Sequence, residues 1–216
     1  MKEKDRYEEF LCRGCGASLK NSTTMRRKDT PYHICKTCGT AQCIYKDLKD
    51  LVTSNNASED RNDDHQMEER FSRMEKYSGY AKLVMDYGCG NGQLAGYISS
   101  HGVPCFAIDT HNNSIIEHIP DGCICSISMV EVIEHLIDPE ATIQTLSRLL
   151  RKGGTIYLET STIDALLRFG EHDYIDPNIG HITILSQFAL CKISENSSLD
   201  LEVINPTSFI MRKPSE

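Results

Sequence analysis

The sequence predicts an α/β fold in which helices cover both faces of a mostly parallel sheet, preceded by a small metal-binding module. From residue 67 onward, apolar runs of strand length alternate with helical patterns. A glycine-rich segment joins one of these runs to a helix, and two CxxC pairs stand within the first 52 residues. Strands that alternate with helices form parallel sheets because each helix returns the chain to the same edge.

At 216 residues, the chain has room for one ordinary domain with an appendage, or for two small domains. We divide it into a zinc ribbon at 1–52, a polar linker at 53–66 and a larger domain at 67–216. The linker TSNNASEDRNDDHQ contains one alanine and otherwise only polar or charged residues. Such a segment cannot bury an apolar face, so we expect a linker or loop there.

Composition limits the possible partners. The formal net charge is −8 and the pI is about 5.5, so the chain as a whole does not attract nucleic acid, although a local basic patch stays open. The charged N-terminus does not suit a signal peptide, and no apolar run approaches the ~18 residues of a membrane span. Ten cysteines then favour thiols or metal ligands in a reducing compartment, so we expect a cytoplasmic protein.

Four cysteines form two CxxC pairs: Cys12 with Cys15, and Cys35 with Cys38. Each pair directs two thiolates at one centre, and four thiolates in a tetrahedron suit zinc. Gly16 and Gly39 follow the pairs and permit tight turns, whereas the nearby His33 and Cys43 are not expected to be ligands. A module of this size has few large apolar residues and needs an added cross-link to be stable, so we expect the zinc to be structural. The alternative is that the four cysteines are unrelated buried thiols.

The first elements of the larger domain follow from the spacing of their apolar residues. Apolar residues from Met67 to Met74 fall on one face of a helix. The run LVMDY at 83–87 is typical of a buried strand, and a helix is expected at 93–100. A further apolar run at 103–108 predicts the next strand.

The remaining elements are strands at 123–130 and 155–160, helices at 139–152 and 186–193, and a strand pair at 201–204 and 209–212. The helix at 139–152 has the clearest ends. Pro139 suits its first turn, Arg151 and Lys152 suit the negative end of its dipole, and Gly153 with its neighbouring glycine would stop it.

The glycine-rich segment DYGCGNG at 86–92 runs from a strand into a helix, which is the context that a cofactor-binding loop requires. No lysine–serine pair of a phosphate-binding P-loop follows, and the carboxylate of Asp86 would repel a phosphate. A positively charged ligand suits this loop better. Asp109 lies 17 residues after Gly92, at the end of the next strand run, where a carboxylate can accept from both hydroxyls of a ribose.

Together with VEVIEHLIDPEATIQTLSRLLRKGGTIYLET, these motifs resemble the class I S-adenosylmethionine-dependent methyltransferases, which have a Rossmann-like fold. The resemblance covers about residues 67–216, and a CxxC ribbon before such a domain resembles a known bacterial arrangement. It implies that the acid and the glycine loop face the amino-acid part of S-adenosylmethionine and that the end of the fourth strand lies beside the sulfonium. The cofactor-binding residues implied are Asp86, Gly88, Cys89, Gly90, Asp109, Met129 and Val130.

One departure from the family concerns its third strand. Only 13 residues separate Asp109 from the strand at 123, too few for the helix and full third strand usually found there. We therefore expect that strand to be short or missing. Either the sheet lacks an edge strand, or Asp121 supplies the adenine-binding acid from a loop.

The segment EVIEHL spaces Glu131, Glu134 and His135 so that one helical turn could direct all three side chains into the cleft. Two carboxylates and an imidazole suit a divalent ion such as Mg²⁺ or Mn²⁺. An ExxEH segment also occurs in quinone-biosynthesis O-methyltransferases and in small-RNA 2′-O-methyltransferases, and in the latter it binds a divalent metal together with a later histidine. His181 stands at a comparable place here.

The metal-free alternative makes His181 the general base, with His135 as second choice. The neighbouring segment from His172 to Tyr174 is expected to be a surface-exposed part of a substrate loop.

The expected reaction is in-line methyl transfer to an oxygen of a sugar, a quinol-like compound or another small molecule. A first alternative is RNA 2′-O-methylation with the ribbon as an RNA clamp, although the acidic pI counts against it. The basic residues of that clamp would be Arg13, Lys20, Arg26, Arg27, Lys28 and Lys36. A second alternative is a non-catalytic assembly module with a degenerate methyltransferase fold. The sequence does not indicate an oligomeric state.

Overall fold

The structure is a computed structural model of the 216-residue chain, and it describes residues 10–20, 22–27, 30–44, 64–78, 83–109, 115–169 and 172–215. Two sheets organise these residues, one of six strands and one of four. Within the described ranges, none of the helices combines the length and the apolar character needed to cross a membrane.

The six-stranded sheet has the order β5-β4-β6-β7-β10-β9. Its strands are β4 (Val84–Tyr87), β5 (Cys105–Ile108), β6 (Ile124–Val130), β7 (Leu150–Glu159), β9 (Asp200–Asn205) and β10 (Ser208–Arg212). The first four strands in this order run parallel, and β10 is antiparallel to both β7 and β9. The predicted α/β fold with a mostly parallel sheet is confirmed.

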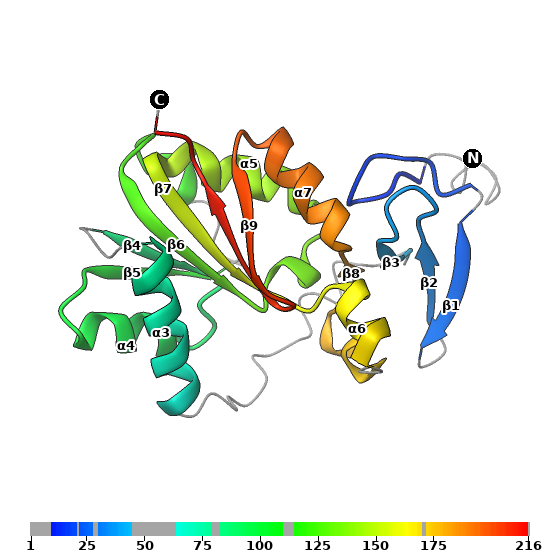
Figure 1. Ribbon diagram of the computed structural model, residues 1–216, viewed down its shortest axis with the longest axis horizontal. Coiled ribbons are helices and arrows are strands. Elements are labelled where there is room, and N and C mark those ends of the chain that lie inside the picture. Colours follow the sequence, from blue (N-terminus) through cyan, green and yellow to red (C-terminus); the bar gives the residue numbers. More distant parts are fainter. Residues whose placement is uncertain are drawn as a thin grey trace.

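Helices cover both faces of this sheet (Figure 1). On one face lie α3 (Asp64–Ser78) and α4 (Gln93–Ser100), and on the other α5 (Pro139–Leu149) and α7 (Gln187–Asn196). Shorter helical segments are α6 (Ile163–Phe169), η2 (Ile133–His135), η3 (His172–Tyr174) and η4 (Pro177–Ile179). The side chains of Asp138 and Ser186 cap α5 and α7, because each accepts a hydrogen bond from a backbone amide three residues later.

Three helices differ from the prediction at their ends. Helix α7 runs to Asn196, three residues beyond the predicted end at 193. Helix α3 begins at Asp64, so the last three residues of the expected 53–66 linker are helical, and 53–63 lie outside the described residues. The expected helix at 139–152 ends at Leu149, and the chain then enters β7. The glycine pair lies in a bulge of that strand, where a Cβ on Gly154 would meet the carbonyl oxygen of Arg151 at 2.8 Å.

In the large sheet, β5 is an edge strand. The described residues between β5 and β6 contain a 3₁₀ turn and no strand, which agrees with a short or missing third strand. Asp121 lies before the amino end of β6 and pairs with Arg148 of α5. Strands β4 and β6 are parallel, and the glycine loop follows the carboxyl end of β4. Asp121, before the amino end of β6, therefore lies at the opposite ends of the strands from this loop. The expectation that it could bind adenine is therefore wrong.

The four-stranded sheet joins the cysteine-rich module to the larger domain. Its order is β1 (Thr23–Arg27), β2 (Thr30–Ile34), β3 (Ala41–Cys43) and β8 (Thr183–Ile184), all antiparallel. Strand β8 comes from the larger domain, and Cys12, Cys35 and Cys38 share one buried cluster with residues such as Leu190 of α7. The ribbon therefore lies at one end of the molecule and packs directly on the larger domain (Figure 1).

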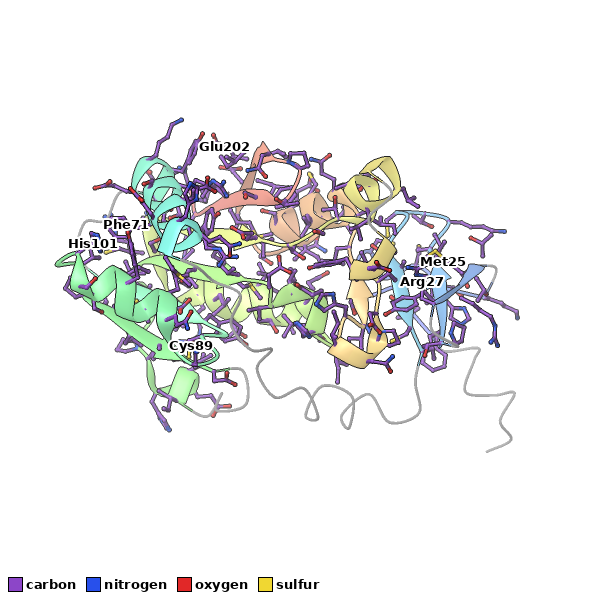
Figure 2. All side chains as sticks on the ribbon, turned by 90° about the horizontal axis from the view of Figure 1, so that it is seen from below. Met25, Arg27, Phe71, Cys89, His101 and Glu202 are labelled. Carbon is purple, nitrogen blue, oxygen red and sulfur yellow. The ribbon has the colours of Figure 1, made fainter. Side chains whose placement is uncertain are left out.

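The opposite end of the molecule is formed by α3 and α4. Phe71 of α3 and His101 lie together there, with ring centroids 4.7 Å apart, far from Met25 and Arg27 of the ribbon (Figure 2). Helix α3 is tied to the sheet by Arg70, whose guanidinium contacts the Glu159 carboxylate at the end of β7 at 2.7 Å.

Candidate active site

Asp86 braces the glycine loop from inside the sheet. Its Oδ1 accepts a hydrogen bond from Ser128 Oγ of β6 at 2.7 Å, and its carboxylate also accepts from the backbone amide of Ala95 in α4. Burial raises the pKa of Asp86 above its ordinary value, although these two hydrogen bonds act in the opposite direction. A cation placed beside this carboxylate would therefore be bound favourably.

The glycines give the loop a backbone path that other residues avoid. Gly88, Gly90 and Gly92 have φ values of 78°, 51° and 81°, in the left-handed region. A Cβ on Gly90 or Gly92 would meet no atom within 4 Å, so this side of the loop is open. Gly92 is the N-cap of helix α4 and provides no side-chain cap, so the positive end of the helix dipole faces the loop.

The other residues expected at the cofactor lie around this loop. The backbone amides of Gly88 and Cys89 donate to the carbonyl oxygen of Ile108 at the end of β5, directly before Asp109. Burial raises the pKa of Cys89, and the charges of Asp86 and Asp109 raise it further, so the two acids flank the loop. At the end of β6, Met129 is fully buried and its neighbour Val130 is half-buried.

The segment after β6 packs directly on the glycine loop. Glu131 has a φ of 52°, rare for a residue with a side chain, and this sharp turn folds the chain back over the loop. A Cβ on Gly88 would lie only 2.3 Å from Cγ2 of Val132. The expected α-helical turn through Glu131, Glu134 and His135 is wrong, because Glu131 stands outside the 3₁₀ helix formed by Ile133–His135.

Glu134 is the centre of a buried cluster. Ligand atoms of Glu134, His135 and His181 lie within 4.8 Å of one another. The Glu134 carboxylate, 1% exposed, accepts hydrogen bonds from the hydroxyls of Tyr174 and Thr160, the latter at 3.1 Å. The carboxyl group of Glu131 interacts with that of Glu134, although it is outside the three ligand atoms that lie within 4.8 Å of one another.

Both imidazoles of the cluster are neutral near pH 7. Nδ1 of His181 lies 2.7 Å from the carbonyl oxygen of Tyr174, and because a carbonyl only accepts, Nδ1 carries the proton. Nε2 then keeps its lone pair, 3.9 Å from Glu134 Oε1. Burial lowers the pKa of His181, and burial together with His181 lowers the pKa of His135 to about 4.

The carboxyl groups of Glu131 and Glu134 lie where burial disfavours their ionised forms. Burial and the charge of Glu134 raise the pKa of Glu131 well above its ordinary value, and burial also raises that of Glu134. Carboxylates in contact in a buried site share either a proton or a cation. The Glu134 carboxylate with two neutral imidazole nitrogens, and Glu131 beside it, are donors that fit a divalent ion.

The role of Tyr174 was missed by the sequence reasoning. We expected this residue to be exposed in a substrate loop, yet its hydroxyl contacts Glu134 and its ring packs on His181 with centroids 4.2 Å apart. Only the tertiary structure brings Tyr174 next to Glu134, 40 residues earlier in the chain. Asp173 beside it is exposed, as expected.

The four ribbon cysteines have the geometry of a zinc site. Their sulfur atoms lie within 4.8 Å of one another, with 3.5 Å between Cys12 and Cys38 and 3.7 Å between Cys15 and Cys35. A tetrahedron with Zn–S bonds of 2.3 Å has edges of about 3.8 Å. Gly16 and Gly39 have φ values of 70° and 81°, and their amides donate to the carbonyl oxygens of Cys12 and Cys35 to close the two turns.

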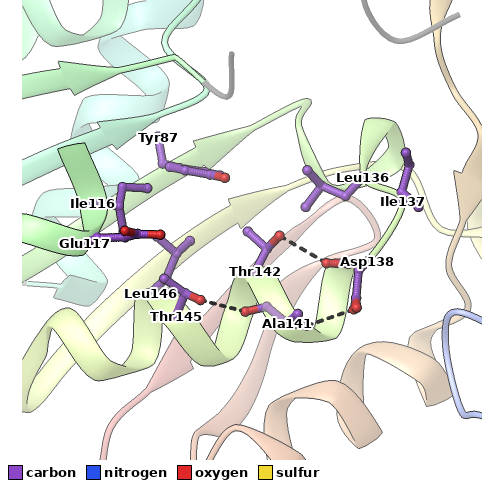
Figure 3. A pocket seen from close by; sticks show the side chains of 10 residues that line it. All are labelled: Tyr87, Ile116, Glu117, Leu136, Ile137, Asp138, Ala141, Thr142, Thr145 and Leu146. Carbon is purple, nitrogen blue, oxygen red and sulfur yellow. Dashed lines mark hydrogen bonds between the residues drawn. The ribbon is translucent and has the colours of Figure 1, made fainter. Parts of the chain in front are cut away.

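A pocket of about 350 Å³ opens between the end of β4 and helix α5 (Figure 3). Its lining residues are Tyr87, Ile116, Glu117, Leu136, Ile137, Asp138, Ala141, Thr142, Thr145 and Leu146. Tyr87 directly precedes the glycine loop, so the pocket adjoins it. The walls combine apolar side chains with polar ones such as Asp138, Thr142 and Thr145, and Glu117 is an exposed acid at the side formed by the short 115–118 turn.

Comparison with known proteins identifies relatives of this chain. Residues 59–203 match the family described as Methyltransferase domain. A ubiquinone biosynthesis O-methyltransferase of Sodalis glossinidius is 24% identical over 104 residues, covering 38% of this chain and 42% of that protein. The chain thus matches only about two fifths of the length of this curated relative.

Two solved structures share the fold. The YcgJ protein of Bacillus subtilis is 18% identical, with a TM-score of 0.50 over 64% of this chain and 71% of that one. The 1,6-didemethyltoxoflavin-N1-methyltransferase of Burkholderia thailandensis, with bound 1,6-didemethyltoxoflavin and S-adenosylhomocysteine, is 13% identical. Its TM-score is 0.54 over 89% of this chain and 100% of that one. At such identities the likeness concerns the fold alone.

The contact between the glycine loop and Val132 predicts a large effect of Gly88→Ala. Strain from the positive φ adds to the clash, so we expect the free energy of unfolding to fall by roughly 3 kcal/mol in a urea titration. Gly92→Ala is the matched control, because it has a similar φ but open space, and it should cost only about 1 kcal/mol. Equal losses in the two variants would contradict the described packing.

Proposed function

This chain belongs to the Methyltransferase domain family, and we propose that it transfers a methyl group from S-adenosylmethionine to a hydroxyl oxygen of a small molecule. The observation that carries the proposal is the packing of Gly88 on Val132. Through this contact, the loop suited to the cofactor lies beside the segment that carries Glu134. A bound methyl donor and a hydroxyl held at the Glu134 cluster would then be neighbours.

The residues around the loop suit the parts of S-adenosylmethionine. Asp86 would attract its ammonium group, the positive end of α4 its carboxylate, and Asp109 its ribose hydroxyls. The pocket beside Tyr87 has room for the adenine and apolar side chains such as Ile116 and Leu146 to pack on it, with Glu117 available to accept from the adenine amino group. This pocket would replace the adenine site that the family builds on its third strand.

On the acceptor side, if the cluster holds no metal ion, His181 is the residue best placed to take the hydroxyl proton. Its Nε2 has a free lone pair because Nδ1 donates to the Tyr174 carbonyl, and its lowered pKa keeps the ring neutral near pH 7. Glu134 would accept a hydrogen bond from the same hydroxyl or from a neighbouring one. Tyr174 and Thr160 hold the Glu134 carboxylate in place, so most of the catalysis would come from positioning.

A divalent ion such as Mg²⁺ or Mn²⁺ fits this cluster. The residues that would hold it are Glu134, His135 and His181, and Glu131, whose carboxyl group interacts with that of Glu134, could join them. The hydrogen bond from His181 Nδ1 to a backbone carbonyl is the arrangement typical of a ligand histidine. When bound, the ion would lower the pKa of an acceptor hydroxyl.

Burial of the cluster favours a small acceptor over RNA. Glu134 and His181 are 1% and 7% exposed, so the acceptor has to enter an enclosed site. Two of the basic residues expected to clamp RNA are engaged within the protein: Arg13 donates to the main-chain oxygens of Ile182 and Cys43, and Arg27 lies 3.6 Å from Asp173. The ubiquinone O-methyltransferase relative supports a quinol-like acceptor. Tight RNA binding that weakens steeply with salt would favour the RNA alternative instead.

Glu134→Gln tests the proposed role of the cluster. We expect methyl transfer from tritium-labelled S-adenosylmethionine to a panel of catechols and quinols, with added Mn²⁺, to fall roughly 100-fold or more because the carboxylate charge is lost. Calorimetry should show unchanged binding of S-adenosylhomocysteine. Glu202→Gln, an exposed glutamate of β9, is the matched control (Figure 2). Full activity in Glu134→Gln would remove the cluster from the mechanism. Absence of S-adenosylhomocysteine binding in the unsubstituted protein would instead favour a non-catalytic module.

Asp86→Asn should separate stability from cofactor binding. Because the folded pKa of Asp86 is raised, folding favours its protonated form while the unfolded chain is ionised above pH about 3.9. The unsubstituted protein thus loses stability as pH rises through that folded pKa, and asparagine removes this loss. We expect Asp86→Asn to gain stability relative to the unsubstituted protein between pH 4 and 7.

The same variant should bind S-adenosylhomocysteine roughly 10-fold or more weakly, because a hydrogen bond to a charged group is lost. Asp200→Asn, at an exposed position of β9, is the control for both measurements. Unchanged affinity in Asp86→Asn would show that this carboxylate does not contact the cofactor.

We propose further that the four ribbon cysteines hold a structural zinc ion. Elemental analysis should find one zinc per chain in the purified protein and none in Cys12→Ser, whose ribbon should become susceptible to proteolysis. Cys43→Ala is the control, because Cys43 is a buried ribbon cysteine outside the cluster. A folded preparation that carries no metal would refute the zinc site.

A further inference from the structure

The short segment that carries His181 is held between the ribbon and the acceptor cluster. On one side, the amide of Ile182 donates to the carbonyl oxygen of Glu134 at 2.9 Å, and the hydroxyl of Thr183 donates to the carbonyl oxygen of Leu136 at 3.1 Å. On the other side, strand β8 pairs with β3 of the ribbon, with Thr183 opposite Gln42. The segment therefore belongs to both parts of the molecule.

Ribbon residues satisfy the backbone carbonyls of this segment. The hydroxyl of Tyr32, a fully buried residue of β2, donates to the carbonyl oxygen of His181 itself. The carbonyl oxygen of Ile182 accepts from the amide of Cys43 at 3.0 Å and from Nη1 of Arg13 at 3.0 Å. These donors fix the direction of the His181 backbone, and none of these hydrogen bonds involves its imidazole.

Tyr32 and Arg13 form a clamp on the 181–183 backbone, which is unrelated to the RNA clamp considered above. Arg13 connects this clamp to the cysteine site, because it lies between Cys12 and Cys15. Arg13 is half-buried, and its guanidinium donates to three acceptors, which are Ile182 O, Thr183 Oγ1 at 2.8 Å and Cys43 O at 3.3 Å. Its own amide donates to Oε1 of Gln42 at 2.7 Å. The planar guanidinium can reach all three acceptors at once, which a lysine ammonium cannot do.

We propose that the ribbon is a positioning element of the acceptor site, in which Tyr32 and Arg13 hold the 181–183 backbone so that Nε2 of His181 faces Glu134. This inference rests on the proposed role of His181 and adds to it a reason for the ribbon. The first CxxC turn positions Arg13. Arg13 and Tyr32 then hold the backbone of residues 181–183, and this backbone determines where the imidazole of His181 lies. Tyr32 and Arg13 are positioning residues, since both act through the backbone.

Tyr32→Phe removes one hydroxyl. Arg13→Lys replaces the guanidinium, which reaches all three acceptors, by an ammonium group that keeps the positive charge. We expect each variant to bind Mn²⁺ roughly 10-fold more weakly in calorimetry, which is typical when a partner that orients a ligand histidine is lost. Zinc content and affinity for S-adenosylhomocysteine should stay within twofold of those of the unsubstituted protein, because neither substitution removes a clustered cysteine or changes the glycine loop.

Two matched controls separate positioning from a general effect on the ribbon or on stability. Lys36→Ala changes the residue that stands in the second CxxC turn where Arg13 stands in the first, and Lys36 is exposed. Tyr97→Phe removes a tyrosine hydroxyl from α4, at the far end of the molecule (Figure 1). Both should bind Mn²⁺ like the unsubstituted protein.

A readout that needs no metal is the side-chain ¹⁵N spectrum of His181, identified by comparison with His181→Gln. We expect the unsubstituted protein to show Nδ1 protonated and Nε2 unprotonated, and Tyr32→Phe and Arg13→Lys to shift or broaden both signals. The two control variants should leave these signals in place.

The outcomes separate this inference from the proposed function. If the unsubstituted protein binds Mn²⁺ and both clamp variants bind it equally well, the inference is overturned while the acceptor site stands. If the unsubstituted protein binds no Mn²⁺, the metal part of the proposed function fails, and the ¹⁵N signals decide. Displaced His181 signals in the clamp variants would support the positioning role, and unchanged signals would overturn it.

Discussion

The rest of the site depends on how the buried carboxylate of Glu134 is partnered. An unpartnered charge at this depth would destabilise the fold by several kcal/mol, so the surrounding elements have to supply donors. Thr160 supplies one after β7 and Tyr174 another from η3, while the backbone carbonyl of the same residue receives the amide of Ile182 before β8. Segments far apart in the chain therefore meet at one residue. The enclosed, polar site that we propose for the acceptor is a result of that requirement.

The ribbon is held in place by contacts with the larger domain, including the segment that partners Glu134. Its three short strands are completed by β8, and three of its four clustered cysteines are buried in the same apolar cluster as α7 and the main sheet. A ribbon of this size has too little apolar surface to be stable alone, so its fold relies on the proposed zinc and on the larger domain. The hydrogen bonds from Arg13 to main-chain oxygens make this junction specific, because each donor requires an acceptor at a set place.

Several features of the site are unfavourable to folding and become understandable only through function. Asp86, Glu131 and Glu134 all have raised pKa values because they are buried, and Glu131 also adopts a left-handed backbone. Residues that destabilise a fold in this way tend to cluster where a ligand is bound. The shortened segment after β5 belongs to the same region, since it leaves a pocket beside the glycine loop. Stability and the proposed binding of cofactor and acceptor are therefore opposed at these positions.

The sequence alone was sufficient for features set by local spacing. Helix α4 was predicted with its observed bounds, and the two CxxC turns with their glycines and the shortened region after β5 also agree with the structure, because neighbouring residues determine each of them. Features set by distant partners required the tertiary structure. From its local sequence, the glycine pair at 153–154 is predicted to end a helix. In the structure it lies in a bulge of β7, which forms only because β7 pairs with β6. Tyr174, Arg13 and the two-residue strand β8 carry no local signal, since their roles come from partners 40 to 170 residues away in the chain. Long-range hydrogen bonds in a buried site decided what those residues do.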